Sequence, residues 1–456
     1  MKPWIYPVGL TAVVGAAVLA TSLSGAVALP AEQVRESATR VSVVCPAFGS
    51  AATRIRVAAQ SVNEKVRTAK LSTPQKTTDT EGLAVVADPG EPVRVSVSGS
   101  QLFGATTSAS AGEGPGRGLS LTSCLAPSAE FWFSGVDVTD AAQSDLILVN
   151  LDSTDAVVDL VAYGAGGRLS APRGLTVKGN ASSSVALGAI SRHPDPITIK
   201  VSTSQGRVAA FVRQITWQGN TPLAAEWVPS GVGPASDQVL PGIPAGNGKR
   251  LLLVTNPGEL TAEVGIDILG ASGRSQLAEA DRVQVPPGVT SVVDLGPGLA
   301  GQAAAVQLTS NHPVVAGLAA DNGLAPVKYD TVLDGPAPPV PSDALWPVAL
   351  GKQSVGTLQL VNPTDADVVV NVSLTAGPKG TPQLTPVTVP ASSTAQLPLP
   401  KADAVSIRIQ TESTAVRAAV LANGSLNTVK GTAVLDLVAN ESRAHRSQVI
   451  FNPHLG

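Results

Sequence analysis

The sequence predicts an all-β protein made of tandem immunoglobulin-like β-sandwich repeats that follow an N-terminal signal or anchor segment. Two observations support this prediction. The chain has 44 Gly and 36 Pro among 456 residues, and its apolar residues are mostly small and aliphatic. Such a composition favours short strands joined by turns over long helices. A pattern of alternating apolar and polar residues also recurs at a constant spacing, as expected of half-buried strands in repeated units.

The repeat is marked by three strands that end in asparagine, with successive asparagines 106 residues apart. Two of the asparagines precede a proline, which biases the preceding residue toward extended backbone. Asparagine itself is common in turns. We therefore expect a structural role in a turn, rather than a ligand-binding role, for these signature residues, which are Asn150, Asn256, Pro257, Asn362 and Pro363.

Each repeat contains six to eight short strands, with turn signals at roughly the 8–12-residue spacing typical of an antiparallel sandwich. A second architecture fits the same strands, in which each repeat forms two four-stranded, β-propeller-like blades. The predicted parts of the chain are 1–29, a signal peptide or transmembrane anchor; 30–125, a divergent β domain; and 126–236, 237–341 and 342–456, the three β repeats.

The N-terminal segment predicts export. Residues 8–29 contain no charged residue, and Ala26 and Ala28 form a small-residue site typical of signal-peptide cleavage. The same run would span about 33 Å as a helix, which is long enough to anchor the chain in a membrane. In either case we expect the rest of the protein outside the cytoplasm, either secreted or anchored to the cell membrane by residues 8–29, with no other membrane contact.

Two cysteines, Cys45 and Cys124, each end an alternating run in the divergent domain. An oxidising compartment would let them pair and close that domain with a disulfide. Two buried free thiols are the alternative. A metal site is a weaker candidate, because no second cysteine or histidine lies at ligand spacing.

The sequence offers little reactive chemistry. The four histidines are scattered, without the paired spacing of a metal site. One GxGxxG sequence, at 296–301, follows a strand but opens no βαβ unit, so we expect a turn there. We predict no catalytic residues, no cofactor and no metal. The net charge of −3 also provides no basic field for nucleic acid, which we exclude as a partner.

A motif points to a family. Cys124-Leu125-Ala126-Pro127 is followed by Phe131-Trp132-Phe133-Ser134-Gly135, and an aromatic strand recurs at Ala344–Val348, with Val239–Gly242 as the corresponding run that lacks tryptophan. Residues 120–425 thereby resemble an uncharacterised family, a domain of unknown function, of exported actinobacterial proteins with tandem LxLxNP and Trp-Phe-x-Gly β repeats. The resemblance implies architecture and location but no activity.

The tryptophans of this motif, Trp132 and Trp346, are expected to fill core volume among small aliphatic residues. A sugar-stacking role is the alternative. The function predicted for the chain is that of a non-enzymatic envelope or secreted scaffold that presents surfaces to an envelope protein or glycan, with open sheet edges available for strand addition. An accessory ectodomain of a membrane complex in envelope glycan assembly is the alternative, and a hydrolase is a minor one.

Overall fold

The computed structural model describes residues 40–47, 54–62, 64–98, 102–190, 193–277, 282–351 and 353–439. They belong to one compact unit, Arg40–Gly456. Nearly all of their regular structure is β-strand, so the all-β prediction is confirmed. The described helices are α2 (Leu187–Ile190), α3 (Gly296–Leu299) and the 3-10 helix η1 (Pro326–Lys328), and none of these could span a membrane. The predicted segment 1–29 lies outside the described residues.

The strands form four two-sheet antiparallel sandwiches. Sandwich 1 contains β1 (Arg40–Cys45), β2 (Arg54–Ser61), β3 (Val66–Lys70), β4 (Thr77–Thr80), β5 (Ala84–Ala87), β6 (Val93–Ser98), β7 (Phe103–Ala111) and β8 (Gly118–Ser123). Sandwich 2 contains β9 (Glu130–Val136), β10 (Ala142–Asn150), β11 (Ala156–Gly164), β12 (Gly167–Leu169), β13 (Leu175–Val177), β14 (Ala181–Ala186), β15 (Ile197–Gln205), β16 (Ala209–Gln218), β17 (Thr221–Val228) and β18 (Ser230–Gly231).

The other two sandwiches follow along the chain. Sandwich 3 contains β19 (Ala235–Ile243), β20 (Arg250–Thr255), β21 (Ala262–Gly270), β22 (Gly273–Gln276), β23 (Arg282–Val285), β24 (Thr290–Asp294), β25 (Ala304–Asp321) and β26 (Thr331–Asp334). Sandwich 4 contains β27 (Asp343–Val348), β28 (Ser354–Asn362), β29 (Val368–Ala376), β30 (Gln383–Val389), β31 (Ser393–Pro398), β32 (Val405–Thr411), β33 (Arg417–Leu426) and β34 (Val429–Asp436).

One strand order is common to all four sandwiches. In sandwich 1 the sheets are β1-β6-β3-β4 and β5-β2-β7-β8, and in sandwich 4 they are β27-β32-β29-β30 and β31-β28-β33-β34. The predicted divergent first domain therefore has the same strand order as the repeats. Because β2 lies in the second sheet while β1 and β3 lie in the first, the two sheets are interleaved along the chain. Consecutive halves of a repeat consequently do not form separate blades, contrary to the alternative prediction.

The apolar residues of alternating strands fill the space between the two sheets. In sandwich 4 this core includes Trp346 from β27, Ile407 from β32, Leu358 from β28 and Val420 from β33, all fully buried. Burial of one face of each strand is what the alternating pattern predicts.

Sandwich 3 differs in one respect. Its β25 is a single strand of 18 residues, which pairs with β19 and β21 in one sheet and with β20 and β26 in the other. The corresponding positions in sandwich 2 are two strands, β15 and β16, separated by a turn at Gly206.

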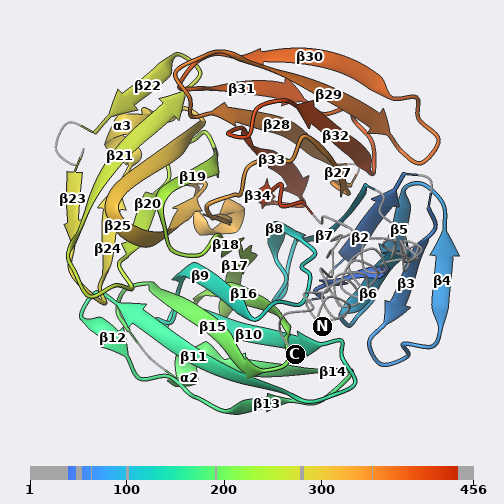
Figure 1. Cartoon of the computed structure of the whole chain (residues 1–456), viewed down its shortest axis with the longest axis horizontal. Coiled ribbons are helices and arrows are strands. Elements are labelled where there is room, and N and C mark those ends of the chain that lie inside the picture. Colours follow the sequence, from blue (N-terminus) through green and yellow to red (C-terminus); the bar gives the residue numbers. More distant parts are fainter. Residues whose placement is uncertain are drawn as a thin grey trace, which may run out of the picture. The chain divides into compact units, whose positions relative to one another are not determined.

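The sandwiches follow one another in a closed cycle. One edge strand of each sandwich, β8, β17, β26 or β34, contacts its counterpart in the next sandwich: β8 contacts β17, β17 contacts β26, β26 contacts β34, and β34 contacts β8. Figure 1 shows β8, β17 and β34 near the middle of the cycle and strands such as β4, β13, β23 and β30 at its periphery. We call β8, β17, β26 and β34 the central strands.

The GxGxxG sequence at 296–301 forms more than the expected turn. Gly296–Leu299 is one turn of helix, α3, with Pro297 in its first turn, and Ala300 and Gly301 follow in the left-handed region at φ 46° and 73°. Proline is favoured at a helix start, and glycine tolerates the left-handed conformation that ends one. A helix of four residues leads into no βαβ unit here, so the prediction of no dinucleotide site is unaffected.

Candidate functional site: buried polar groups of the central strands and seams

The signature asparagines share one geometry. The side-chain Nδ2 of Asn256 donates to the carbonyls of Leu260 (2.7 Å) and Val285 (2.9 Å), and its Oδ1 accepts from the backbone N–H of Gly258 (3.0 Å). Asn150 and Asn362 make the corresponding bonds, and all three side chains are fully buried. Each asparagine thus closes the turn after its strand and ties that turn to the opposite sheet. The prolines Pro257 and Pro363 begin the same turns.

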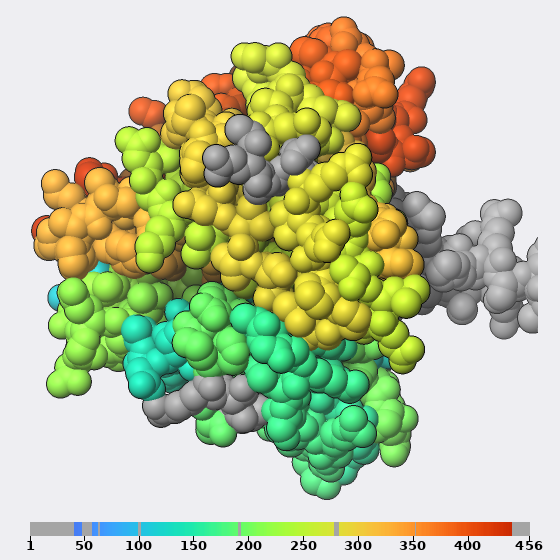
Figure 2. Space-filling view, turned by 90° about the vertical axis from the view of Figure 1, so that its left-hand side faces the viewer, coloured from blue at the N-terminus to red at the C-terminus, as the bar shows by residue number. Residues whose placement is uncertain are grey.

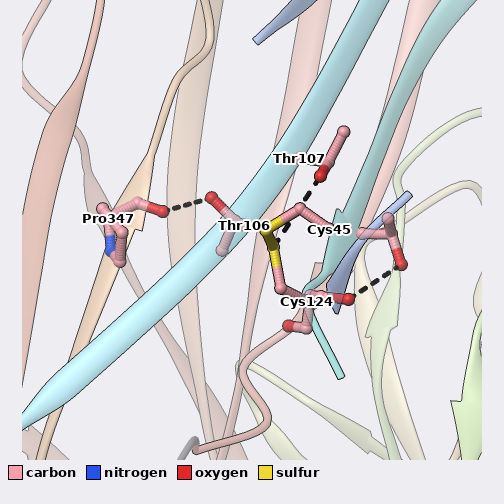
Figure 3. Close-up of a disulfide and its surroundings, with 7 residues drawn as sticks. Cys45, Thr106, Thr107, Cys124 and Pro347 are labelled. Atoms are coloured by element: carbon pink, nitrogen blue, oxygen red, sulfur yellow. Dashed lines mark hydrogen bonds between the residues drawn. A yellow bond between two sulfur atoms is a disulfide. The ribbon is translucent and has the colours of Figure 1, made fainter. Parts of the chain in front are cut away.

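The two cysteines form a disulfide, so the predicted pairing is confirmed. Cys45 and Cys124 are fully buried, with Cα atoms 4.4 Å apart, and the bond joins the two sheets of sandwich 1 (Figure 3). Thr107 Oγ1 lies 3.8 Å from the Cys124 sulfur. The neighbouring Thr106 hydroxyl donates to the carbonyl of Pro347 in sandwich 4. The disulfide therefore stands beside a contact between the first and last sandwiches.

The two motif tryptophans occupy different places. Trp346 is fully buried in the core of sandwich 4, and its Nε1 donates to the carbonyl of Val438 (2.9 Å). Trp132 is 3 % exposed and points away from the core of its own sandwich. It stacks on Tyr163, contacts Val315 of β25, and donates from Nε1 to Glu130 (2.7 Å). Trp132 therefore fills the seam between sandwiches 2 and 3.

A chain of hydroxyl groups crosses that seam. The chain runs from Ser134 through Thr198 and Thr255 to Thr290. The distances between successive hydroxyl oxygens are 2.8, 2.7 and 2.8 Å. The last hydroxyl, on Thr290, donates to the carbonyl of Tyr163 (3.1 Å). Because a carbonyl can only accept, each preceding hydroxyl must donate toward it, so the direction of the chain is fixed. Figure 2 shows the surfaces of sandwich 2 (green) and sandwich 3 (yellow) in direct contact.

The central strands carry four buried carboxyl groups, which the sequence did not single out: Glu226 on β17, Asp330 directly before β26, Asp334 at the end of β26, and Asp436 at the end of β34. Asp330 is fully buried and accepts backbone N–H bonds from Leu119 (3.1 Å), Thr331 (3.1 Å) and Thr432 (2.9 Å). Leu119 belongs to sandwich 1 and Thr432 to sandwich 4, so one carboxyl group joins three sandwiches.

Burial is the largest cause of the raised pKa values of these four carboxyl groups. It raises the pKa of Asp330 to about 8, although the three backbone N–H groups and the nearby Arg117 act to lower it. Burial also raises the pKa of Glu226 well above its usual value, and the charge of Asp330 raises it further. A carboxyl group that keeps its proton can donate a hydrogen bond as well as accept one.

Arg117 holds the ends of several elements together. It is 7 % exposed and donates from its guanidinium to the carbonyls of Leu223 and Pro222, the latter at 3.3 Å, and of Pro326 at 2.8 Å. These carbonyls belong to the start of β17 and to η1. A buried guanidinium with carbonyl partners in two other sandwiches acts as a fixed connector between them.

The carboxyl groups line neither of two cavities in the described part of the chain. One cavity, of about 420 Å³, is lined by polar residues that include Arg250, Asp321 and Lys430. The other, of about 410 Å³, is lined by apolar residues that include Phe131, Pro338 and Val41. None of the four buried carboxyl groups lines either cavity. In this arrangement the carboxyl groups accept hydrogen bonds from backbone N–H groups.

Two acidic residues in the turn after β10 are paired with cations. Asp152 pairs with Arg207 at 2.9 Å, and Asp155 pairs with Lys178 at 2.7 Å. In each case the cation lowers the pKa of the carboxyl group. Among the residues that the structure describes, no group of three or more histidine, cysteine, aspartate or glutamate side chains could hold a metal ion.

Two solved structures have a weak likeness to the chain. The first is a Streptomyces avermitilis alpha-L-rhamnosidase complexed with L-rhamnose, which is 11 % identical with a TM-score of 0.15 over 85 % of this chain and 55 % of that one. The second is a tetra-tandem repeat from the extending region of a large adhesion protein, 14 % identical with a TM-score of 0.09 over 87 % and 98 %. This chain spans about half the length of the rhamnosidase. Neither likeness carries an argument about fold or function.

No curated protein matches the chain. A family does, and its match runs over residues 75–400, which include parts of sandwiches 1 and 4 and all of sandwiches 2 and 3. Because the match covers well over half of the sequence, the chain belongs to the family of unknown function DUF5719.

Proposed function

We propose that this protein is an exported, non-enzymatic scaffold that presents the outer surfaces of its four sandwiches to a protein or glycan of the cell envelope. The observation that carries the proposal is the use of the buried polar side chains. Asp330, Arg117 and the Ser134–Thr290 hydroxyl chain all bond across the boundaries between sandwiches. These buried polar groups join neighbouring sandwiches, which supports a role in holding the binding surfaces together.

The buried disulfide supports export, because such bonds persist in oxidising compartments. The uncharged run at residues 8–29 supports the same location. A rigid platform with a fixed relation between its surfaces suits a protein whose role is to hold a partner rather than transform it.

Binding of a partner by adding a strand to the outer edges of the sheets has less support. In sandwich 4 the outer edge strand β30 carries Pro386, which has no N–H to donate to an added strand. In sandwiches 2 and 3 the corresponding edge is divided into two short strands, β12 with β13 and β22 with β23. Edges interrupted in these ways resist pairing with another chain. We therefore propose recognition through outward side chains.

The test uses the purified full chain with its disulfide intact. Binding is measured by the retardation of the protein in gels containing envelope polysaccharide and by cross-linking in intact envelopes, and product formation is followed by mass spectrometry. We expect a specific retardation or cross-link without any product. Turnover that is lost in a carboxylate variant would refute the proposal.

Two leucines provide matched surface variants. Leu260 in sandwich 3 and Leu384 in sandwich 4 are 64 % and 63 % exposed, so a change to glutamate perturbs each surface equally. A specific partner is expected to lose affinity for one of L260E and L384E and to keep its affinity for the other. An equal loss in both variants would indicate nonspecific adhesion and contradict the proposal.

A further inference from the structure

Two of the buried carboxyl groups meet at the boundary between sandwiches 3 and 4. Asp334 is fully buried at the end of β26, and Asp436 is 9 % exposed at the end of β34. The two strands are in contact, and the two carboxyl groups lie within hydrogen-bonding reach of each other. A bond between two carboxyl groups requires a proton on one of them, because ionised carboxylates only accept.

The remaining bonds of the pair leave one oxygen on each side for this proton. Asp334 Oδ2 accepts from the backbone N–H of Gly242 (3.0 Å), and Asp436 Oδ2 accepts from the backbone N–H of Gly335 (3.3 Å). The Oδ1 atoms of both residues are buried, and neither accepts a hydrogen bond from a donor among the described residues. With both groups ionised, two negative oxygens would be buried with no donor for either one, which is costly in a protein interior.

The surroundings are closely packed. A side-chain carbon added at Gly242 would lie 2.9 Å from Asp334 Oδ1 and 2.3 Å from a methyl carbon of Val434. Val434 and the nearby Leu421 belong to sandwich 4, yet they pack into the core of sandwich 3. The carboxyl pair therefore lies inside a continuous apolar seam.

Other charged groups stand on the elements around the pair. They are Asp237 on β19, His312 and Asp321 on β25, Glu226 on β17, Lys328 on η1, Arg417 on β33, Lys430 on β34, and Asp330 and Arg117 beside β26 and β8. Arg417 donates to the carbonyls of Ala337 and Ala415, and Lys430 donates to the hydroxyl of Ser425 (3.1 Å). The bonds of these two cations therefore go to groups other than the Asp334–Asp436 pair.

We propose that Asp334 and Asp436 form a proton-operated latch, which keeps the seam between sandwiches 3 and 4 closed while the pair holds its shared proton and loosens the seam when that proton is lost. The raised pKa values of both carboxyl groups also favour retention of the proton while the seam is closed. Burial raises the pKa of Asp334 to about 6, while burial and the charge of Asp334 raise the pKa of Asp436 well above its usual value.

The sign of the pH effect follows from these shifts. An exposed aspartate titrates near 3.9, so the closed seam binds more protons than an open one from about pH 4 upward. Closure is therefore strongest at acid pH and weakens as the pH rises. Each proton released on opening raises the opening constant by up to about tenfold per pH unit.

Amide hydrogen exchange of the full chain tests the latch, because the N–H groups of Gly242 and Gly335 are bonded to the pair. After correction for intrinsic exchange, we expect protection at these two glycines to fall at least tenfold between pH 5 and pH 9. Amides of Val95–Val97 in β6 of sandwich 1, whose sheet has no described strand in contact with β26 or β34, serve as the internal control and are expected to change less. Equal changes at both places would overturn the proposal.

A variant separates the latch from general pH effects. In Asp436→Asn the amide can still accept from Gly335 and donate to Asp334, but the shared proton is gone. We expect protection at Gly242 to lose most of its pH dependence in this variant, and likewise at Gly335 in Asp334→Asn, where the roles are exchanged. Full retention of the wild-type pH dependence in both variants would refute the latch. The wild-type measurement decides the question by itself if the variants do not fold.

Discussion

Replacing Asn256 with alanine removes three hydrogen bonds from a fully buried position. Each bond contributes about 0.5–1.5 kcal/mol, and the carbonyls of Leu260 and Val285 and the N–H of Gly258 lose their side-chain partner. We therefore expect the free energy of unfolding to fall by about 1.5–4.5 kcal/mol. Urea denaturation of the full chain, followed by circular dichroism, measures the change.

The control is Asn311→Ala, which removes one exposed bond, from the backbone N–H of Glu263 to Asn311 Oδ1 (2.8 Å). We expect a loss of about 1 kcal/mol or less from this change. Because Asn150 and Asn362 have the same bonds as Asn256, their alanine variants are expected to lose a similar amount. A loss below about 1 kcal/mol for Asn256→Ala, or no difference from the control, would refute the assignment of a structural role.

Three further predictions concern the disulfide, the hydroxyl chain and the central carboxyl groups. Cys45→Ala, which opens a disulfide with a sequence separation of 79, is expected to lower the free energy of unfolding by about 4–5 kcal/mol, and reduction of the denatured wild type is expected to slow or prevent refolding. Thr255→Val removes a buried hydroxyl that is hydrogen-bonded on both sides, and it is expected to lower the free energy of unfolding by about 2–3 kcal/mol in urea denaturation. Thr203→Val, which removes an exposed hydrogen bond, is expected to lower it by under about 1 kcal/mol. Equal losses would contradict the role of Thr255 in the seam. Because burial raises the pKa of Asp330 to about 8, the folded state holds this proton while the unfolded state releases it near pH 3.9. Stability is therefore expected to fall by up to about 1.4 kcal/mol per pH unit from pH 4 to pH 8 through this group. Urea denaturation at several pH values is expected to show a flatter pH dependence for Asp330→Asn than for wild type, and an unchanged dependence would contradict the assignment.

The role of the signature asparagines could be predicted from the sequence because several of their hydrogen bonds join residues that are close along the chain. Asn256 bonds to Gly258 and Leu260, two and four residues away, and such short-range turn bonds have a recognisable residue pattern. The alternation of apolar residues likewise identified the strands, since side chains on a strand alternate between faces. The same alternation places Phe131 and Phe133 inward and Trp132 outward. The expectation that Trp132 fills the core of its own repeat is therefore wrong, because the two flanking phenylalanines take the inward positions.

The buried carboxyl groups could not be found in the same way. Asp334 precedes Gly335, and Asp-Gly is a common turn dipeptide, so its local pattern indicates an exposed turn. The partner of Asp334 is 102 residues away in another sandwich, and only the closure of the cycle brings the two together. Asp330 similarly bonds to backbone groups 211 and 102 residues away. Contacts of this range depend on tertiary arrangement and leave no periodic trace in the sequence.

The contact of β34 with β8 has a consequence for how the gene can change. An open row of repeats can gain or lose a member by duplication or deletion, because each new copy finds a neighbour of the same kind. Here every neighbour is chemically distinct: hydroxyl groups join the second and third members, and acids join the third and fourth. A fifth sandwich would have to separate β34 from β8, and it would contact surfaces that are complementary to other sandwiches. We therefore expect the number and the order of the sandwiches to stay constant.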